Sequence, residues 1–144
     1  MFYGEYEHTI DDKGRVTLPA RFRDAYAGGV VLSKGFDKCI DVFPRGTWDS
    51  SVRSRLAGLD SFSPEARELR RFVFTGATEY EPDKQCRVLL PPTLVAHAGI
   101  EREVVIAGVD DRLEIWDRRA WVEHLTAVGG SAYDVAERLA SQRS

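Results

Sequence analysis

The chain contains little of what metal, redox or membrane proteins require. Its 144 residues include two cysteines and three histidines, and neither type has the spacing of a metal or redox motif. No apolar run approaches the roughly 20 residues that span a bilayer. The N-terminus also lacks the charged and then apolar pattern of a signal peptide. We therefore expect a cytoplasmic protein with no metal or cofactor, in which Cys39 and Cys86 are free thiols.

The common enzyme motifs are missing as well. There is no His-Glu-x-x-His pattern, no phosphate-binding glycine-rich loop and no nucleophile motif. One constellation could support chemistry, because Cys86 stands beside Asp83 and Arg87, where a neighbouring cation can activate a thiol. No base is positioned to serve it. The sequence therefore predicts a protein that is not an enzyme.

Positive charge is not in excess either, since the formal net charge is -3. That sum argues only mildly against nucleic acid as a partner, because a local patch decides binding more than the total does. Such a patch is present, formed by Lys13, Arg15, Arg21 and Arg23. With 43% apolar and 30% charged residues, the rest of the composition is that of an ordinary globular domain.

What the sequence does contain is an internal duplication. The segment GEYEHTIDDKGRVTLP, from Gly4, aligns without a gap with GATEYEPDKQCRVLLP, from Gly76. Both copies contain Asp-x-x-x-Arg followed by Val-x-Leu-Pro. Later, Ile-Asp-Val-Phe at 40–43 is matched by Leu-Glu-Ile-Trp at 113–116. Duplicated units usually bury a shared core and present their loops as a pair, so we expect function in the repeated charged loop.

Each copy is expected to form two strand pairs, each followed by a helix. In the first copy, residues 2–10 and 15–18 should close a hairpin around Asp-Asp-Lys-Gly, a sequence typical of turns. Pro19 should then open a helix that ends near Tyr26. The second copy should begin with a strand over 75–80. Because these strands are too short to be stable alone, we expect one interleaved α+β domain with internal pseudo-two-fold symmetry.

Further helices are expected after each second strand pair. One begins at Pro44 and carries apolar residues at spacings of four on one face: Trp48, Val52 and Leu56. Another begins at Ser63-Pro64-Glu65, with serine as the N-cap. The last two are separated by Gly129-Gly130. Arg67, Arg70 and Arg71 are expected on a solvated helix face or in a subunit contact, and the three tryptophans in packing.

The two Asp-x-x-x-Arg/Val-x-Leu-Pro motifs in register resemble the MraZ family of bacterial transcriptional regulators, built from two SpoVT/AbrB-type swapped-hairpin units. The resemblance extends from the Met-Phe-x-Gly opening to the Leu-Glu-Ile-Trp-Asp segment that ends at Asp117. It implies a duplicated swapped-hairpin AbrB-like β-barrel with flanking helices. One AbrB-type domain would cover residues 5–47 and the second residues 76–119.

The resemblance also implies a function. Members of the family bind double-stranded DNA at direct repeats in a promoter and control the division and cell-wall gene cluster that contains their own gene. They assemble into ring-like homo-oligomers. A nucleoid-associated repressor, with no membrane partner and no small-molecule substrate, is the expectation for this chain.

The resemblance also assigns roles to individual residues, according to their position in the motif. The resemblance implies DNA contacts from Arg15, Lys13, Arg23, Arg87, Lys84 and Gln85. Asp11 and Asp83 would orient the two loop arginines, or cap their own turns. The second copy departs from the pattern, because Cys86 replaces the turn glycine Gly14 and Val95 stands where the first copy has its helix arginine. The first loop is therefore expected to read DNA more strongly.

An arginine at a hairpin tip can pair with guanine O6 and N7, which is worth about 1–3 kcal/mol of discrimination. The plainer alternative is a local surface ion pair in each loop, which contributes little. Two other functions stay open at this stage. The chain could be a scaffold that assembles through strand edges, or an AbrB-type antitoxin with a toxin-binding tail, which the duplication and the short C-terminal extension disfavour.

Overall fold

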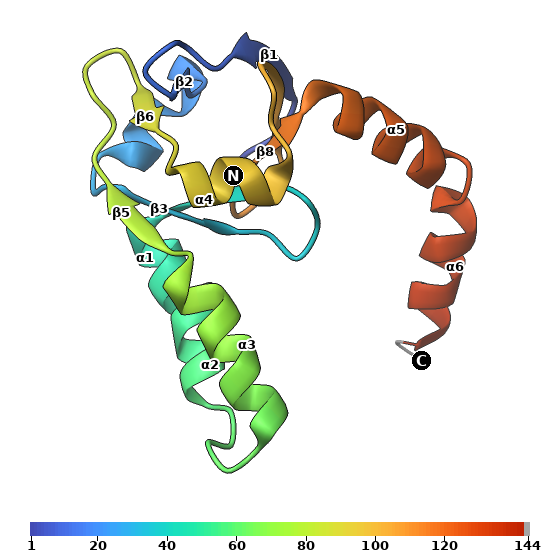
Figure 1. The fold of residues 1–144 in the computed structure, drawn as a ribbon. Coiled ribbons are helices and arrows are strands. Elements are labelled where there is room, and N and C mark those ends of the chain that lie inside the picture. Colours follow the sequence, from blue (N-terminus) through green and yellow to red (C-terminus); the bar gives the residue numbers. More distant parts are fainter. Residues whose placement is uncertain (143–144) are drawn as a thin grey trace.

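The structure is a computed structural model that describes residues 1–142 (Figure 1). Its strands are β1 (Glu5–Thr9), β2 (Arg15–Thr17), β3 (Val30–Lys34), β4 (Ile40–Pro44), β5 (Thr78–Tyr80), β6 (Arg87–Leu89), β7 (Glu103–Gly108) and β8 (Leu113–Asp117). Its helical segments are η1 (Ala20–Tyr26), α1 (Arg45–Trp48), η2 (Asp49–Arg53), α2 (Ser54–Ala57), α3 (Pro64–Thr75), α4 (Pro92–Ala98), α5 (Arg118–Gly129) and α6 (Ala132–Gln142). Within residues 1–142, no helix is both long and apolar enough to cross a membrane.

The strands form a six-stranded antiparallel sheet in the order β1-β7-β8-β4-β3-β5 and a separate two-stranded ribbon, β2-β6. Among the ladders of residues 1–142, only β3-β4 and β7-β8 pair strands from the same copy. The other ladders join one copy to the other, as in β1-β7, where Tyr6 lies opposite Ile106. An interleaved α+β domain is therefore confirmed.

The hairpin expected between residues 2–10 and 15–18 is not formed as a ladder. The turn itself closes, since the Asp11 N–H donates to the Arg15 carbonyl oxygen at 2.9 Å. Beyond that bond β1 pairs with β7 and β2 with β6. The physical reason is burial, because Val16 on β2 reaches the core only as part of the ribbon that covers the sheet.

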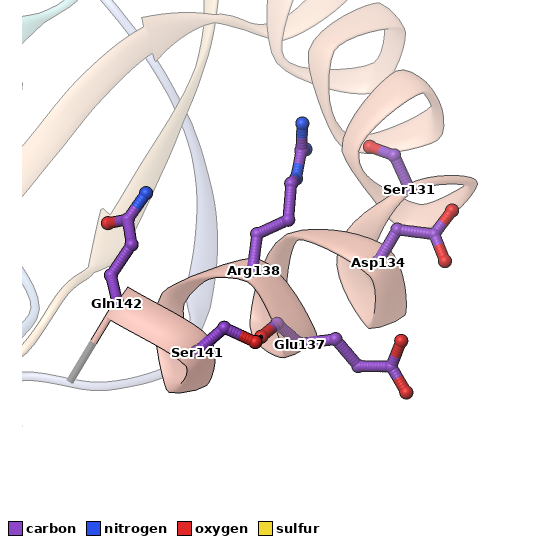
Figure 2. Close-up of a pocket in the computed structure, with 6 residues that line it drawn as sticks. All are labelled: Ser131, Asp134, Glu137, Arg138, Ser141 and Gln142. Atoms are coloured by element: carbon purple, nitrogen blue, oxygen red, sulfur yellow. Dashed lines mark hydrogen bonds between the residues drawn. The ribbon is translucent and has the colours of Figure 1, made fainter. Parts of the chain in front are cut away.

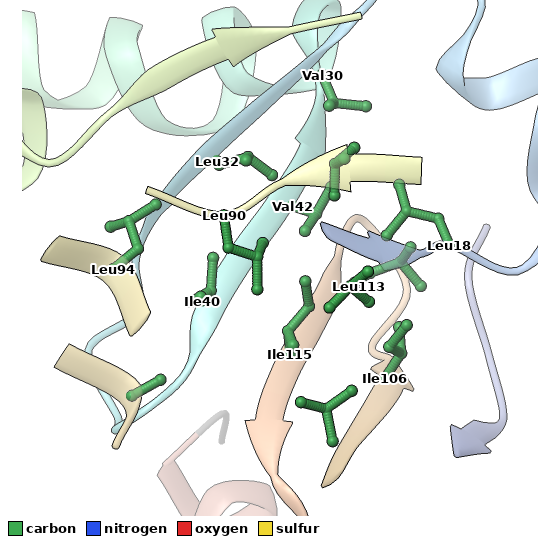
Figure 3. Close-up of a cluster of buried hydrophobic side chains, with 14 of the residues drawn as sticks. Leu18, Val30, Leu32, Ile40, Val42, Leu90, Leu94, Ile106, Leu113 and Ile115 are labelled. Atoms are coloured by element: carbon green, nitrogen blue, oxygen red, sulfur yellow. The ribbon is translucent and has the colours of Figure 1, made fainter. Parts of the chain in front are cut away.

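The main core lies between the ribbon and one face of the six-stranded sheet. Val16 and Val88 face each other in the ribbon and are 1% and 0% exposed. Beneath them lie alternate residues of the central strands and one side of α4 (Figure 3): Val30, Leu32, Ile40, Val42, Ile106, Leu113, Ile115 and Leu94. Burial of this shared apolar surface is the dominant force that holds the two copies together.

A helical hairpin covers the other face of the sheet at β3 and β4. The first arm runs through α1, η2 and α2, and α3 returns beside it (Figure 1). Trp48 and Leu56 are buried in a second cluster, and Val52 packs against it, as the spacing of four predicted. The Ser63 hydroxyl accepts from the Ala66 N–H at 3.3 Å, which confirms the expected N-cap.

Arg70, expected on a solvated face or in a subunit contact, is half-buried and has a structural role as well. Its guanidinium donates to the carbonyl oxygens of Leu56, Ala57 and Leu59 and so fixes the turn between α2 and α3. One expectation about this hairpin is wrong. The strand expected from Thr75 begins at Thr78 instead. Here α3 continues to Thr75 because its last turns bury Val73 against the second cluster.

The C-terminal helices α5 and α6 extend away from the body of the molecule (Figure 1). Asp117 caps α5 by accepting from the Ala120 N–H at 3.3 Å. The first helix of the chain, η1, differs from the expected helix in being of the 3-10 type. It is anchored by Tyr26, whose hydroxyl donates to the Pro19 carbonyl oxygen at 3.0 Å.

Candidate nucleic-acid interface

The β2-β6 ribbon places the two motif arginines on one surface. Arg15 lies opposite Leu89, and Arg87 lies opposite Thr17, on either side of the Val16–Val88 pair. Because side chains alternate along a strand, both arginines are on the face of the ribbon that points away from the core. They are diagonal neighbours, a relationship that puts two residues roughly 7–8 Å apart, with their Cβ atoms somewhat closer.

In the first loop, Asp11 holds the turn and the arginine at once. Its Oδ1 accepts from the backbone N–H groups of Arg15, at 2.8 Å, and Lys13, at 3.0 Å. Its Oδ2 accepts from the Arg15 Nε at 2.8 Å. The Arg15 backbone N–H, then its side chain and the Lys13 N–H, lower the pKa of the Asp11 carboxyl below 3.8. Capping and orienting, the two roles considered from sequence, are thus combined in one carboxylate.

The second loop repeats this geometry. The Asp83 Oδ1 accepts from the backbone N–H groups of Arg87 and Gln85, both at 2.9 Å, and its Oδ2 from the Arg87 Nε at 2.7 Å. Again the backbone N–H of the arginine leads the interactions that lower the pKa of the aspartate. Both arginines are therefore oriented before any partner arrives.

The outer ends of the two guanidinium groups are available. Only Nε of Arg15 and Nε of Arg87 bond to protein; across residues 1–142 their Nη atoms have no hydrogen-bond partner. Lys13, Lys84 and Gln85 are exposed beside them. The ribbon thus offers two fixed arginine forks and flexible polar side chains on one face.

The turn position is left-handed in both loops. Gly14 has a φ of +82° and Cys86 a φ of +61°, so Cys86 adopts the conformation expected for the glycine it replaces. For a residue with a side chain this costs about 1–2 kcal/mol. Cys86 is 2% exposed and, like Cys39, is a free thiol, as predicted.

Arg23 makes a contact that the sequence did not predict. Its Nε donates to the Cys86 Sγ at 3.4 Å, so the helix arginine of the first copy contacts the loop of the second. Arg23, Asp83 and Lys84 also line one pocket of about 300 Å³. The equivalent Val95 packs against the main core instead. No local sequence signal could reveal this contact, because it depends on how the two copies pair.

Arg21 belongs to a separate group. It donates to the hydroxyls of Tyr3, at 2.7 Å, and Tyr6, at 3.4 Å, and its guanidinium lies 4.8 Å from the centre of the Tyr3 ring. This arginine therefore packs against the N-terminal segment, apart from the loops.

Taken together, the fold and the loops define a duplicated α+β protein with two matching arginine loops on one ribbon. A family model described as "MraZ protein, putative antitoxin-like" matches residues 1–72 and again residues 73–140. The chain therefore belongs to the MraZ family.

Curated relatives match along almost the full length. The chain is 46% identical over 143 residues to a protein of Roseiflexus castenholzii, with 99% of both chains covered. It is 42% identical over 141 residues to a protein of Thermomicrobium roseum, covering 98% of this chain and 99% of the relative. A Moorella thermoacetica protein is 43% identical over 139 residues, with 96% of both chains covered. All three bear the name "Transcriptional regulator MraZ".

Proposed function

We propose that this protein is a sequence-specific DNA-binding transcriptional regulator. It binds direct repeats in the promoter of the division and cell-wall gene cluster that contains its own gene, and it represses that cluster. The protein acts in the cytoplasm, where it is associated with the nucleoid. The names of the relatives support a role in transcription, and the geometry of the ribbon supports DNA as the partner.

The observation that carries the proposal is the pair of braced arginines on one outward face, Arg15 with Asp11 and Arg87 with Asp83. The major groove of DNA is wide enough for a two-stranded ribbon, and an arginine fork fits guanine O6 and N7. Because the Asp fixes Nε, the guanidinium loses less conformational freedom on binding.

The remaining site residues supply affinity rather than sequence reading. Lys13 and Lys84 contact phosphates, and such contacts weaken as salt rises. Gln85 reaches a base edge or the backbone from the tip of the second loop. Arg23, held beside Cys86, adds positive charge to that loop.

We further infer that the two halves are SpoVT/AbrB-type swapped-hairpin units, over residues 5–47 and 76–119. The cross-copy pairing of β1 with β7 and of β2 with β6 supports this architecture. Copies of the chain assemble into a ring. One ribbon touches few bases, and several ribbons on a ring would combine weak contacts through high effective concentration, which makes direct repeats a suitable target.

The test is a titration of the full chain with a duplex from upstream of its own gene and with a scrambled duplex, at two salt concentrations. A preference for the native duplex that persists at higher salt supports the proposal. Equal affinity for both duplexes, lost on adding salt, would reduce the interaction to phosphate attraction. No binding at either salt would favour a scaffold or an antitoxin, and the size of the assembly would then become the first measurement.

A further inference from the structure

A pocket of about 300 Å³ lies on the face of the sheet that points away from the ribbon. Apolar side chains of the second cluster form one wall: Phe43, Trp48, Val52, Leu56 and Val73. Pockets that bind small molecules combine an apolar wall of this kind with a few convergent polar groups. The polar groups here come from both copies of the duplication.

Three polar residues stand in a row across the floor of the pocket. Ser33 on β3 lies opposite Asp41 on β4, which lies opposite Glu114 on β8. They are 2%, 8% and 8% exposed, and they occupy the face opposite the main core. Like charges directly opposite each other destabilise a sheet, so the Asp41–Glu114 pair needs positive charge beside it.

Within residues 1–142, Arg112 is the one cationic side chain that forms ion pairs with these acids. Arg112 bonds to Asp41 at 3.3 Å, to Glu114 at 3.0 Å and to Asp111 at 3.0 Å. One guanidinium thus serves three carboxylates. Burial, opposed by Arg112, raises the pKa of Asp41 to about 6, because desolvation disfavours the charged form of the carboxyl group. Lys34 and Arg55 also line the pocket, but within residues 1–142 neither forms an ion pair with these carboxylates, so a second cation could still bond to Asp41.

Ser33 adds an unpaired hydroxyl to the pocket. The residue lines the pocket and is 2% exposed, and within residues 1–142 its hydroxyl forms no hydrogen bond to protein. Because its oxygen is not one of the fully enclosed unpaired atoms, it keeps access to the pocket, where a ligand could bond to it. Its place beside Asp41 makes it a natural second acceptor for an N–H donor.

One cationic side chain already lies against an aromatic ring in this pocket, since the Arg112 guanidinium is 5.8 Å from the centre of the Phe43 ring. We propose that the pocket binds a small organic cation, an alkyl- or arylammonium, whose ammonium bonds to Asp41 and Ser33 and whose apolar body packs against Phe43 and Trp48. This ligand would supply a second positive charge beside Asp41, and the aromatic wall would favour it further through cation–π attraction.

A metal ion fits the same cluster less well. The ligand atoms of Cys39, Asp41 and Glu114 lie within 4.8 Å of one another. However, burial raises the pKa of the Cys39 thiol far above its usual range, and a protonated thiol is a poor metal ligand. Both carboxylates are also bonded to Arg112.

Another pocket gives weaker evidence for a ligand. Figure 2 shows this pocket along α6, lined by Ser131, Asp134, Glu137, Arg138, Ser141 and Gln142. These side chains are exposed and come from one helix and the residue before it, so they enclose no buried polar group.

The test is calorimetric titration of the full chain with 2-phenylethylammonium, with its neutral analogue 2-phenylethanol and with Zn²⁺, at pH 7.5. We expect the ammonium to bind at least about tenfold more tightly than the alcohol, because a hydrogen bond between charged groups is stronger than one that involves a neutral group. Equal affinity for the two would mean a merely apolar pocket. Tighter binding of Zn²⁺, or no binding of the ammonium, would also overturn the proposal.

Asp41→Asn keeps the shape of the floor and removes its charge, so it should weaken ammonium binding about tenfold. Glu101→Gln, an exposed acid outside the pocket, is the matched control and should leave affinity unchanged. Circular dichroism would check the fold of each variant, and Ser33→Ala, with a smaller loss, gives a second readout. Unchanged affinity in folded Asp41→Asn would refute the site.

The wild-type protein offers a readout that needs no variant. Affinity for the ammonium should fall between pH 7.5 and 5, because protonation of Asp41 removes the acceptor. The charged groups around it are Lys34, Asp37, Arg55, Asp111, Arg112 and Glu114, with the Cys39 thiol adjacent. A pH-independent affinity would contradict a role for Asp41. None of these measurements depends on DNA binding, because the ribbon lies on the opposite face.

Discussion

Gly14 and Cys86 occupy equivalent positions in the two loops, and each bonds to the other copy. The Gly14 carbonyl oxygen accepts from the Leu90 N–H and the Cys86 carbonyl oxygen from the Leu18 N–H, both at 2.8 Å. These bonds continue the β2-β6 ladder at both ends, so the left-handed turns set the registration of the ribbon. A change at either turn therefore acts on both copies.

Gly14→Ala should destabilise the protein by about 1–2 kcal/mol, because an added Cβ must adopt a φ of +82°. Space is not the obstacle, since the nearest atom to that Cβ, Leu89 Cδ1, would lie at 3.5 Å. Gly46→Ala is the matched control. It lies in α1 with open space around its Cβ position, and we expect it to stabilise by about 0.4–1 kcal/mol.

Urea unfolding of both glycine variants measures these differences. If Gly14→Ala were as stable as Gly46→Ala, the left-handed turn would not be a constraint in solution.

Arg15→Ala and Arg87→Ala should each reduce the preference for the native duplex by about 1–3 kcal/mol. We expect comparable losses, because the two loops share one geometry and because Arg23 lies against the second loop rather than the first. Lys13→Ala is the contrasting variant and should weaken binding to all sequences alike, with a smaller salt dependence.

Fluorescence anisotropy with native and scrambled duplexes separates these effects. A much larger loss from Arg15→Ala would instead support the stronger first loop expected from sequence. Arginine variants that lose only non-specific affinity would contradict base reading.

Leu90→Ala should cost about 2–5 kcal/mol of stability, the usual range for a buried leucine. Leu90 is 3% exposed and Leu89, its neighbour, is 43% exposed on the outer face of the ribbon. Leu89→Ala should therefore change stability by about 0.5 kcal/mol or less. Thermal unfolding of the two variants tests the assignment of faces, and the opposite order of effects would mean that β6 is shifted by one residue.

Stability should fall as pH rises from about 4 to 6. The pKa of Asp41 is about 6 in the folded protein against 3.8 in the absence of structure, so in this window the folded state holds more protons than the unfolded state. By linkage, the contribution is lost as pH rises and amounts to roughly 2–3 kcal/mol at most. Asp11 and Asp83 act in the opposite direction, but only as pH falls below 3.8.

Unfolding free energies measured at several pH values, in wild type and in Asp41→Asn, would test this. The variant should show a flatter profile and higher stability at pH 7. An unchanged slope would assign the effect to another carboxyl group.

Much of the fold could be read from local sequence. Ser63 was correctly predicted to cap its helix, the spacing of Trp48 and Leu56 identified a buried face, and the Asp-Asp-Lys-Gly sequence predicted the turn that ends at Gly14. Local patterns specify which face of a strand is apolar but not which strand lies beside it. The pairing of β2 with β6 was therefore missed, and with it the contact between Arg23 and Cys86.

The cross-copy pairing also has a consequence during synthesis on the ribosome. Glu5 pairs with Ala107, so β1 leaves the ribosome before its partner strand, which is made about a hundred residues later, roughly 5–20 s at usual rates of translation. During that interval both edges of β1 are open to other chains. The two charges on its short sequence, Glu5 and Glu7, are the kind of feature that keeps such an edge from pairing wrongly.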